Sequence, residues 1–177
     1  MEQTYVMTAF AKDRPGVLNS VSGLLSENGC NLLDCTMTRL MGEFAMILAF
    51  SSRIQGIEER LLRACRRLER DEEISVYFTR SDPRTEKEMR PLEEQTIHVE
   101  GIDHAGIVYK VSGVLASGNM NIESLSAEQA QAPGSGTAMY SLDIKFLLPD
   151  DVDLDKLDKD LARVANELHV EIVRSKS

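Results

Sequence analysis

The residues with the clearest chemical potential in this sequence occur in two copies. Asp13 and Gly16 match Asp103 and Gly106 at a spacing of 90 positions. In both copies they stand where a strand-like apolar pattern gives way to a helix-like apolar pattern. An aspartate at that point lies near the positive end of the helix, where it can cap the first backbone N–H groups. Helix capping is therefore one interpretation of both aspartates.

These residues belong to a longer internal repeat. Residues 13–36 align on residues 103–126 without a gap and share seven identities in 24 positions, Asn31 with Asn121 among them. Chance would supply about one or two identities. Later segments match at an offset of 96, which places one six-residue insertion in the loop-like stretch 129–137. Both asparagines follow a helix stop signal, so a turn role competes with ligand contact for them.

The repeat predicts two domains of about 80 residues each. We assign residues 1–80 to the first domain, 81–93 to a linker and 94–177 to the second. The linker holds two prolines and seven charged residues, which is typical of a solvated and rather stiff connection. Domains this small bury a modest fraction of their surface, so face-to-face or edge-to-edge pairing would stabilise them.

Composition narrows the classes of partner. The net charge is -9, and residues 81–177 carry -8 of it. An acidic protein repels the phosphate backbone, so we expect no direct nucleic-acid binding. The three cysteines form no CxxC motif, no signal peptide is recognised, and no apolar run reaches the roughly 20 residues of a membrane span. We expect a cytoplasmic protein without membrane contact.

Hydrophobic periodicity predicts the same order of elements in both halves. The expected strands and helices cover 4–11, 17–28, 30–40, 43–50, 57–68 and 74–79, followed by 96–101, 107–118 and counterparts ending with a helix over 154–168 and a strand over 169–174. The order is βαββαβ, which indicates class α+β with antiparallel sheets and both helices on one face. We place Pro15 in the first helical turn. The recurrence of Gly23 and Gly113 suggests that each helix lies close to its sheet, and the alternative is that each is a tolerated weak point of its helix.

Two further groups of residues have a functional and a structural interpretation. Five arginines give the second helix a basic face, but six nearby acidic residues favour a solvated, salt-bridged surface over a nucleic-acid or acidic-protein contact; the arginines are Arg60, Arg63, Arg66, Arg67 and Arg70. Cys30 and Cys35 are five residues apart on one strand, which predicts opposite faces and argues against a disulfide or shared metal. We expect the three thiols to be small buried apolar groups.

A βαββαβ unit whose first strand runs into Asp-Arg-Pro-Gly at 13–16, and whose first helix precedes Cys-Asn-Leu at 30–32 or Met-Asn-Ile at 120–122, resembles the ACT domain. ACT domains are small regulatory domains that sense amino acids in metabolic enzymes and transcription regulators. Two of them in a chain of this length resemble the glycine cleavage system transcriptional repressor family. The resemblance implies two ferredoxin-like βαββαβ domains.

The resemblance also implies a ligand site. ACT domains pair side by side into a continuous sheet, and the amino acid lies between the strand-to-helix loop of one domain and the second strand of its neighbour. The implied ligand-binding residues are Asp13, Arg14, Pro15, Gly16 and Asn31 in the first half, and Asp103, His104, Gly106 and Asn121 in the second. A helix N-terminus attracts the ligand carboxylate, and Asp and Asn side chains can bind its ammonium group.

The second copy departs from this pattern, because Arg14 and Pro15 are replaced by His104 and Ala105. The change removes a fixed charge and a rigid residue from the loop. Either the second half binds differently, or it serves mainly as the structural partner of the first. His104 is either a pH-sensitive ligand group or an exposed loop residue without a special role.

We therefore expect a non-catalytic regulator that binds a small amino acid such as glycine or serine and uses no cofactor or metal. It would regulate transcription of glycine and one-carbon metabolism through contact with a protein partner, as a homo-oligomer. The alternative is a detached regulatory subunit of a biosynthetic enzyme, so the partner is either a transcription factor or a metabolic enzyme. Catalysis is not expected, since the sequence contains no HExxH, GxSxG, P-loop or Rossmann glycine pattern.

Overall fold

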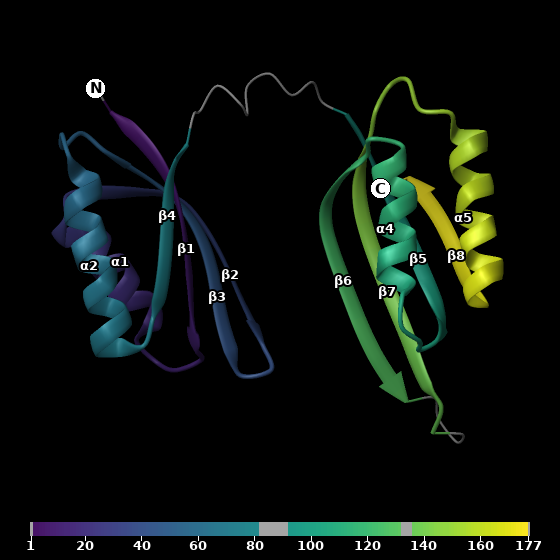
Figure 1. Ribbon diagram of the computed structural model, residues 1–177, viewed down its shortest axis with the longest axis horizontal. Helices are drawn as coiled ribbons and strands as arrows, with labels where there is room; N and C mark the ends of the chain where they lie inside the picture. Colours follow the sequence, from purple (N-terminus) through teal and green to yellow (C-terminus); the bar gives the residue numbers. More distant parts are fainter. Residues whose placement is uncertain (1, 82–91, 132–135, 177) are drawn as a thin grey trace. The chain divides into compact units, whose positions relative to one another are not determined.

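The computed structural model describes residues 2–81, 92–131 and 136–176. The chain divides into two compact units, Met1–Glu88 and Met89–Ser177. In each unit a four-stranded antiparallel sheet has two helices on one face (Figure 1). The predicted linker at 81–93 falls mainly on residues 82–91, which lie outside the described residues.

The first unit contains the elements β1 (Gln3–Lys12), α1 (Val17–Glu27), β2 (Cys30–Leu40), β3 (Glu43–Ser52), α2 (Ile57–Glu72) and β4 (Ser75–Ser81). Its strand order is β2-β3-β1-β4. The second unit contains β5 (Glu93–Ile102), α4 (Ile107–Ser117), β6 (Asn121–Gln131), β7 (Ala138–Leu148), α5 (Leu154–Leu168) and β8 (Val170–Lys176), in the order β6-β7-β5-β8. Both units therefore have the predicted α+β fold, and β2 and β6 are edge strands.

The strand registers reproduce the sequence repeat residue by residue. Thr8 pairs with Ile47 in the first sheet, and His98 pairs with Asp143 in the second. These partners correspond at the offsets of 90 and 96 found in the sequence. The extra residues of the second copy lie in the connection between β6 and β7, of which residues 132–135 fall outside the described part. Equivalent positions in the two units can therefore be compared directly.

Each core lies between the sheet and its two helices. Burial alternates along β1, where Tyr5, Met7 and Ala9 face the helices. The Tyr5 ring stacks on Phe50 with ring centroids 5.2 Å apart. The apolar stripe of α1 covers this face. Its buried residues are Val17, Val21, Leu24 and Leu25. The apolar faces predicted for β1 and α1 therefore form the core of the first unit. Burial of apolar surface is the dominant favourable contribution to the free energy of folding.

Two local expectations were wrong. Gly23 and Gly113 do not lie against the sheet, because a Cβ built on either residue meets no atom within 4 Å. Cys30 and Cys35 share one face of β2, because a β-bulge between Leu32 and Asp34 shifts the register by one residue. Both thiols consequently pack against the first core, together with the buried Cys65.

Candidate functional site

The loop between β1 and α1 is built around a glycine that needs a left-handed backbone. Gly16 has φ +101° immediately before α1, and Gly106 has φ +102° before α4. A side chain is strained in this conformation, which explains why both copies keep glycine. Pro15 lies before Gly16 and therefore outside α1, which begins at Val17. The sequence had predicted Pro15 in the first turn of this helix.

Neither aspartate of the loops caps its helix. Within the described residues no side chain caps α1 or α4. The Asp13 carboxylate instead lies 3.4 Å from Arg39 Nη1, and Asp103 accepts a 2.5 Å hydrogen bond from Gln129. The Asp13 backbone N–H also donates to the Gly42 carbonyl over 2.9 Å. Both loops are thereby fixed to the hairpin end of the edge strand, and the helix N–H groups remain uncapped.

Arg14 and His104 make equivalent contacts in spite of their different chemistry. Arg14 donates to the carbonyl of Glu72 over 2.8 Å, and His104 Nε2 lies 2.7 Å from the carbonyl of Leu168. These carbonyls occupy the last turns of α2 and α5, where helices leave acceptors without intrahelical partners. Both side chains thus fasten the loop to the end of the second helix.

The environment of His104 favours its protonated form. Its Nε2 faces the Leu168 carbonyl, and its Nδ1 lies 3.1 Å from the carbonyl of Ala105. Two acceptors demand two N–H donors, which an imidazolium has and a neutral imidazole lacks. The hydrogen bonds to Leu168 and then to Ala105 therefore raise the pKa of His104 above its ordinary value. When it is protonated, the His104 side chain provides a positive charge at the position of Arg14.

The predicted asparagines lie far from the loops of their own units. Asn31 pairs with Ser51, which pairs with Thr4 near the start of β1, whereas Asp13 follows the end of that strand. At about 3.3 Å per residue, the eight steps from Thr4 to Lys12, the residue before Asp13, span roughly 26 Å. Asn121 has the corresponding place on β6 and donates to Glu123 over 2.7 Å. No single unit brings its loop and its asparagine together.

Sequence reasoning missed the residues that hold the aspartates. Arg39 and Gln129 occupy equivalent positions of β2 and β6, 26 residues after Asp13 and Asp103 respectively. Their different side chains both contact the loop carboxylate, so the geometry recurs although the residue type does not. The sequence repeat offers no identity at this position that could have revealed the contact.

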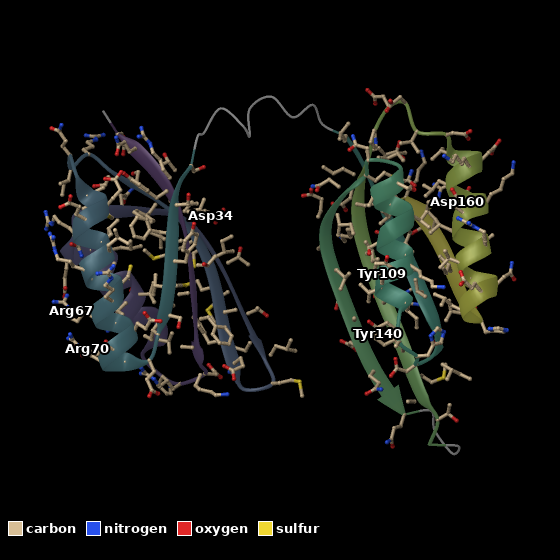
Figure 2. All side chains as sticks on the ribbon, viewed as in Figure 1. Asp34, Arg67, Arg70, Tyr109, Tyr140 and Asp160 are labelled. Carbon is tan, nitrogen blue, oxygen red and sulfur yellow. The ribbon has the colours of Figure 1, made fainter. Side chains whose placement is uncertain are left out.

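The basic face of α2 carries local ion pairs. Figure 2 shows Arg67 and Arg70 projecting from α2 away from the sheet. Arg70 Nε lies 2.7 Å from Asp71 Oδ1, and Arg67 Nη2 lies 3.8 Å from Glu27 Oε2. The hydrogen bond to Asp71 raises the pKa of Arg70, and the same bond lowers the pKa of Asp71. These contacts support a solvated, salt-bridged surface.

The thiols behave as small apolar groups in this structure. Burial raises the pKa of Cys65 to about 11 and also raises that of Cys30. A thiol must lose its proton to act as a nucleophile or metal ligand, so both are poorly suited to such chemistry at neutral pH. The described residues contain no cluster of histidine, cysteine and acidic side chains that could hold a metal ion.

The fold and the sequence together define the class of protein. The ACT domain family model matches residues 3–79, which run from β1 almost to the end of β4. The second unit repeats the strand order and the register of the first. Residues 3–79 therefore match the ACT domain family, and the second unit has the same strand order as the first.

Comparison with particular proteins covers nearly the whole chain. The chain is 25% identical over 170 residues to the glycine cleavage system transcriptional repressor of Escherichia coli (strain K12), which spans 94% of this chain and 86% of that protein. A crystal structure of an unknown protein from Galdieria sulphuraria is 26% identical, with a TM-score of 0.82 over 100% of this chain and 99% of that chain. A proposed glycine cleavage system transcriptional repressor has a TM-score of 0.70 at 22% identity, over 100% of this chain and 99% of its own.

The chain thus has an ACT domain match in its first unit and is similar to the glycine cleavage system transcriptional repressor over 94% of its length. Within the described residues, no helix is both long enough and apolar enough to cross a membrane.

Proposed function

We propose that this protein is a non-catalytic regulator that binds a small amino acid and transmits the signal by contact with another protein. The observation that carries this proposal is the similarity to the Escherichia coli glycine cleavage system transcriptional repressor, which runs through both units. The ACT domain match to residues 3–79 supports an amino acid as the class of ligand. Glycine and serine are the first ligands to test, because the relative is named for glycine cleavage.

The amino acid would bind at an edge strand that is shared between two ACT units. β2 and β6 are edges of their sheets, and each loop lies at the opposite end of its sheet from its asparagine. If an edge strand pairs antiparallel with that of a neighbouring unit, the loop of one unit lies level with the asparagine of the other. Asp13 with Gly16 and a neighbour's asparagine would then contact the same ligand.

The chemistry of these residues suits an amino acid. The uncapped N–H groups that follow Gly16 carry partial positive charge and would bind the ligand carboxylate. The Asp13 carboxylate and an asparagine carbonyl oxygen would accept hydrogen bonds from the ammonium group. Arg14 and His104 would act from behind, by holding the loop against the second helix of the same unit.

A ligand at such a seam would act by favouring one pairing of units over another. Its effect is limited to the difference in affinity between the two pairings, typically a coupling of about 1–3 kcal/mol. The output is a changed surface or oligomeric state that a protein partner recognises. The net charge of -9 argues against DNA as the direct partner.

The class of partner is tested by affinity capture. The tagged full-length chain is used as bait in a lysate of its source organism, with and without added glycine or serine, and the captured proteins are quantified by mass spectrometry. We expect a transcription factor whose recovery changes with the amino acid. An Asn31→Ala bait should recover it without that dependence. Recovery of a metabolic enzyme and no transcription factor would instead support the detached regulatory subunit.

A further inference from the structure

The face of each sheet that is turned away from the helices, here called the open face, differs sharply between the two units. In the first unit its central positions are Thr8, Phe10, Thr36, Thr38, Ile47 and Tyr77, which are neighbours across all four strands. These six residues also line a groove of about 490 Å³. None of them is charged. The open face of the first unit is thus a concave surface that is largely apolar.

Five of the six equivalent positions in the second unit are polar or charged. They are His98, Glu100, Ser126, Glu128, Asp143 and Val173, matched to the first set by strand register. Three of the six are carboxylates, and the His98 Nδ1 lies 2.8 Å from Asp143. An open face that remains in contact with water needs side chains of this kind. The first unit has no charged side chain at any of these positions.

The first open face exposes three large side chains of mainly apolar character. Phe10, Ile47 and Tyr77 are 52%, 51% and 70% exposed. Because a large side chain of this type can bury 150–250 Å², these three present roughly 300–400 Å² of mainly apolar area. A patch of this size is comparable to the largest apolar patch on a typical monomer, roughly 300–600 Å², and that largest patch is often functional. With the threonines around it, the face is large enough for one sheet-on-sheet contact.

A second copy of the same face fits this surface best. Face-to-face contact with an identical face buries no charged side chain at these positions, so it avoids the cost of an unpaired buried charge. The second unit's open face would place Glu100 and Asp143 against Phe10 and Ile47, or against like charges if it paired with itself. The three large side chains of two copies together supply roughly 600–800 Å², and the threonines and neighbouring strand residues must supply the rest of the roughly 1,200 Å² at which specific interfaces begin.

We propose that two copies of this chain associate through the open faces of their first sheets, related by a two-fold axis. The contact packs Phe10, Ile47 and Tyr77 of each copy between the sheets, and the threonine hydroxyls of β1 and β2 hydrogen-bond around them. This surface is separate from the edge strands to which the ligand is assigned, so the proposal does not depend on amino-acid binding.

The test is the mass of the full-length chain in solution, measured by sedimentation velocity at about 50 μM, which populates a dimer of micromolar Kd. Ile47→Asp introduces the residue type of Asp143, which occupies the equivalent position in the second unit. In a two-fold interface each copy contributes this substitution, so two new charges are buried. We expect Ile47→Asp to halve the mass of the assembly and to raise the dissociation constant by at least about 100-fold. Tyr77→Glu should have the same effect. It is a second, independent test of the proposal if Ile47→Asp folds poorly.

Val173→Asp provides the matched control, because Val173 occupies the position of Tyr77 on the open face of the second unit and is 48% exposed. It should leave the mass unchanged. Circular dichroism establishes that each variant is folded. A wild-type chain that sediments as a 19.7 kDa monomer overturns the proposal. So does an Ile47→Asp variant that keeps the wild-type mass, or a Val173→Asp variant that loses it.

Discussion

At the scale of single residues, Arg14 and His104 show how one contact survives a change of chemistry. Both side chains donate to a carbonyl in the last turn of the second helix of their unit. Arginine keeps its charge at every physiological pH, whereas histidine loses it near neutrality. The two copies of the loop should therefore respond differently to pH.

The His104 contact should make the stability of the second unit depend on pH. Since the pKa of His104 is raised in the folded state, its contribution is fully present below the unfolded pKa of about 6.5 and is lost as pH rises through the folded value. Thermal melts from pH 5.5 to 8.5 should show this loss. His104→Arg, which copies Arg14, should abolish that component of the pH dependence. A variant whose melting curve follows the same pH profile as the wild type would contradict this assignment.

Gly23 is expected to be replaceable with a gain in stability. It lies inside α1 with helical geometry, and an added Cβ would meet open space. Gly23→Ala should raise the free energy of unfolding by about 0.5–1 kcal/mol, because alanine loses less backbone entropy on folding. Urea denaturation measures the change.

Gly101→Ala is the control for this prediction, because the same substitution should here lower the free energy of unfolding. A Cβ at Gly101 would lie 2.6 Å from Val170 Cγ1 and 3.1 Å from the Val170 Cα. Overpacking of this kind typically costs about 1–3 kcal/mol. A destabilised Gly23→Ala variant would mean that the α1 backbone needs glycine for a reason that the structure does not contain.

At the scale of elements, β1 is tied to α2 by one buried hydroxyl. The Tyr5 side chain is fully buried, and its hydroxyl donates to Glu58 Oε1 over 2.6 Å. Burial, followed by the bond to Glu58, raises the pKa of Tyr5 to about 12, and the same bond lowers the pKa of Glu58. Tyr5 is therefore a structural residue that connects the central strand to the first turn of the helix.

Tyr5→Phe should destabilise the first unit by about 1 kcal/mol or somewhat more, because it removes a hydrogen bond to a charged group while it keeps the stacked ring. Chemical denaturation of the full chain measures the loss. Tyr109 on α4 is 80% exposed and provides the control, shown in Figure 2. Tyr109→Phe should change stability by less than about 0.5 kcal/mol. Equal effects of the two substitutions would remove the structural role assigned to the Tyr5 hydroxyl.

The elements were predictable from the sequence because period and repeat agree. Alternating burial in β1 and the apolar stripe of α1 follow directly from the order of residues. The bulge after Leu32 was not predictable, because one extra residue in a strand leaves no mark in composition, and it reversed the expected faces of Cys30 and Cys35. The place of Pro15 was also misjudged, because the left-handed Gly16 stands between Pro15 and the first residue of α1.

At the scale of the whole molecule, the two copies share one fold and differ in surface. Their strand order and registers coincide, but the open face of the first unit is apolar where that of the second is charged. Residues 81–177 also carry -8 of the net charge of -9. We interpret the duplication as a division of tasks, in which the first unit provides an association surface and the second keeps the chain soluble. This interpretation comes from comparing the side chains at matched positions of the two open faces. The sequence repeat matches these positions, but it does not show which of them lie on the same face of a sheet.

The predicted ligand site belongs to this scale because no unit contains it alone. The loop residues Asp13 and Gly16 recur in sequence with Asn31, yet roughly 26 Å of sheet separates them within one unit. Sequence identified the residue types but could not show that the strand register holds them apart within one unit. The seam therefore stays a proposal that ligand binding must test.

The most direct test of the central claim is calorimetric titration of the full-length chain with each of the twenty amino acids, followed by thermal melts with those that bind. We predict that one or two bind, glycine or serine among them, and that saturation at about 100 times Kd stabilises the fold by about 2.7 kcal/mol. Asn31→Ala should abolish the effect, and Asn166→Ala, an exposed asparagine of α5, should preserve it. Binding of none of the twenty, or full binding by Asn31→Ala, would contradict the account.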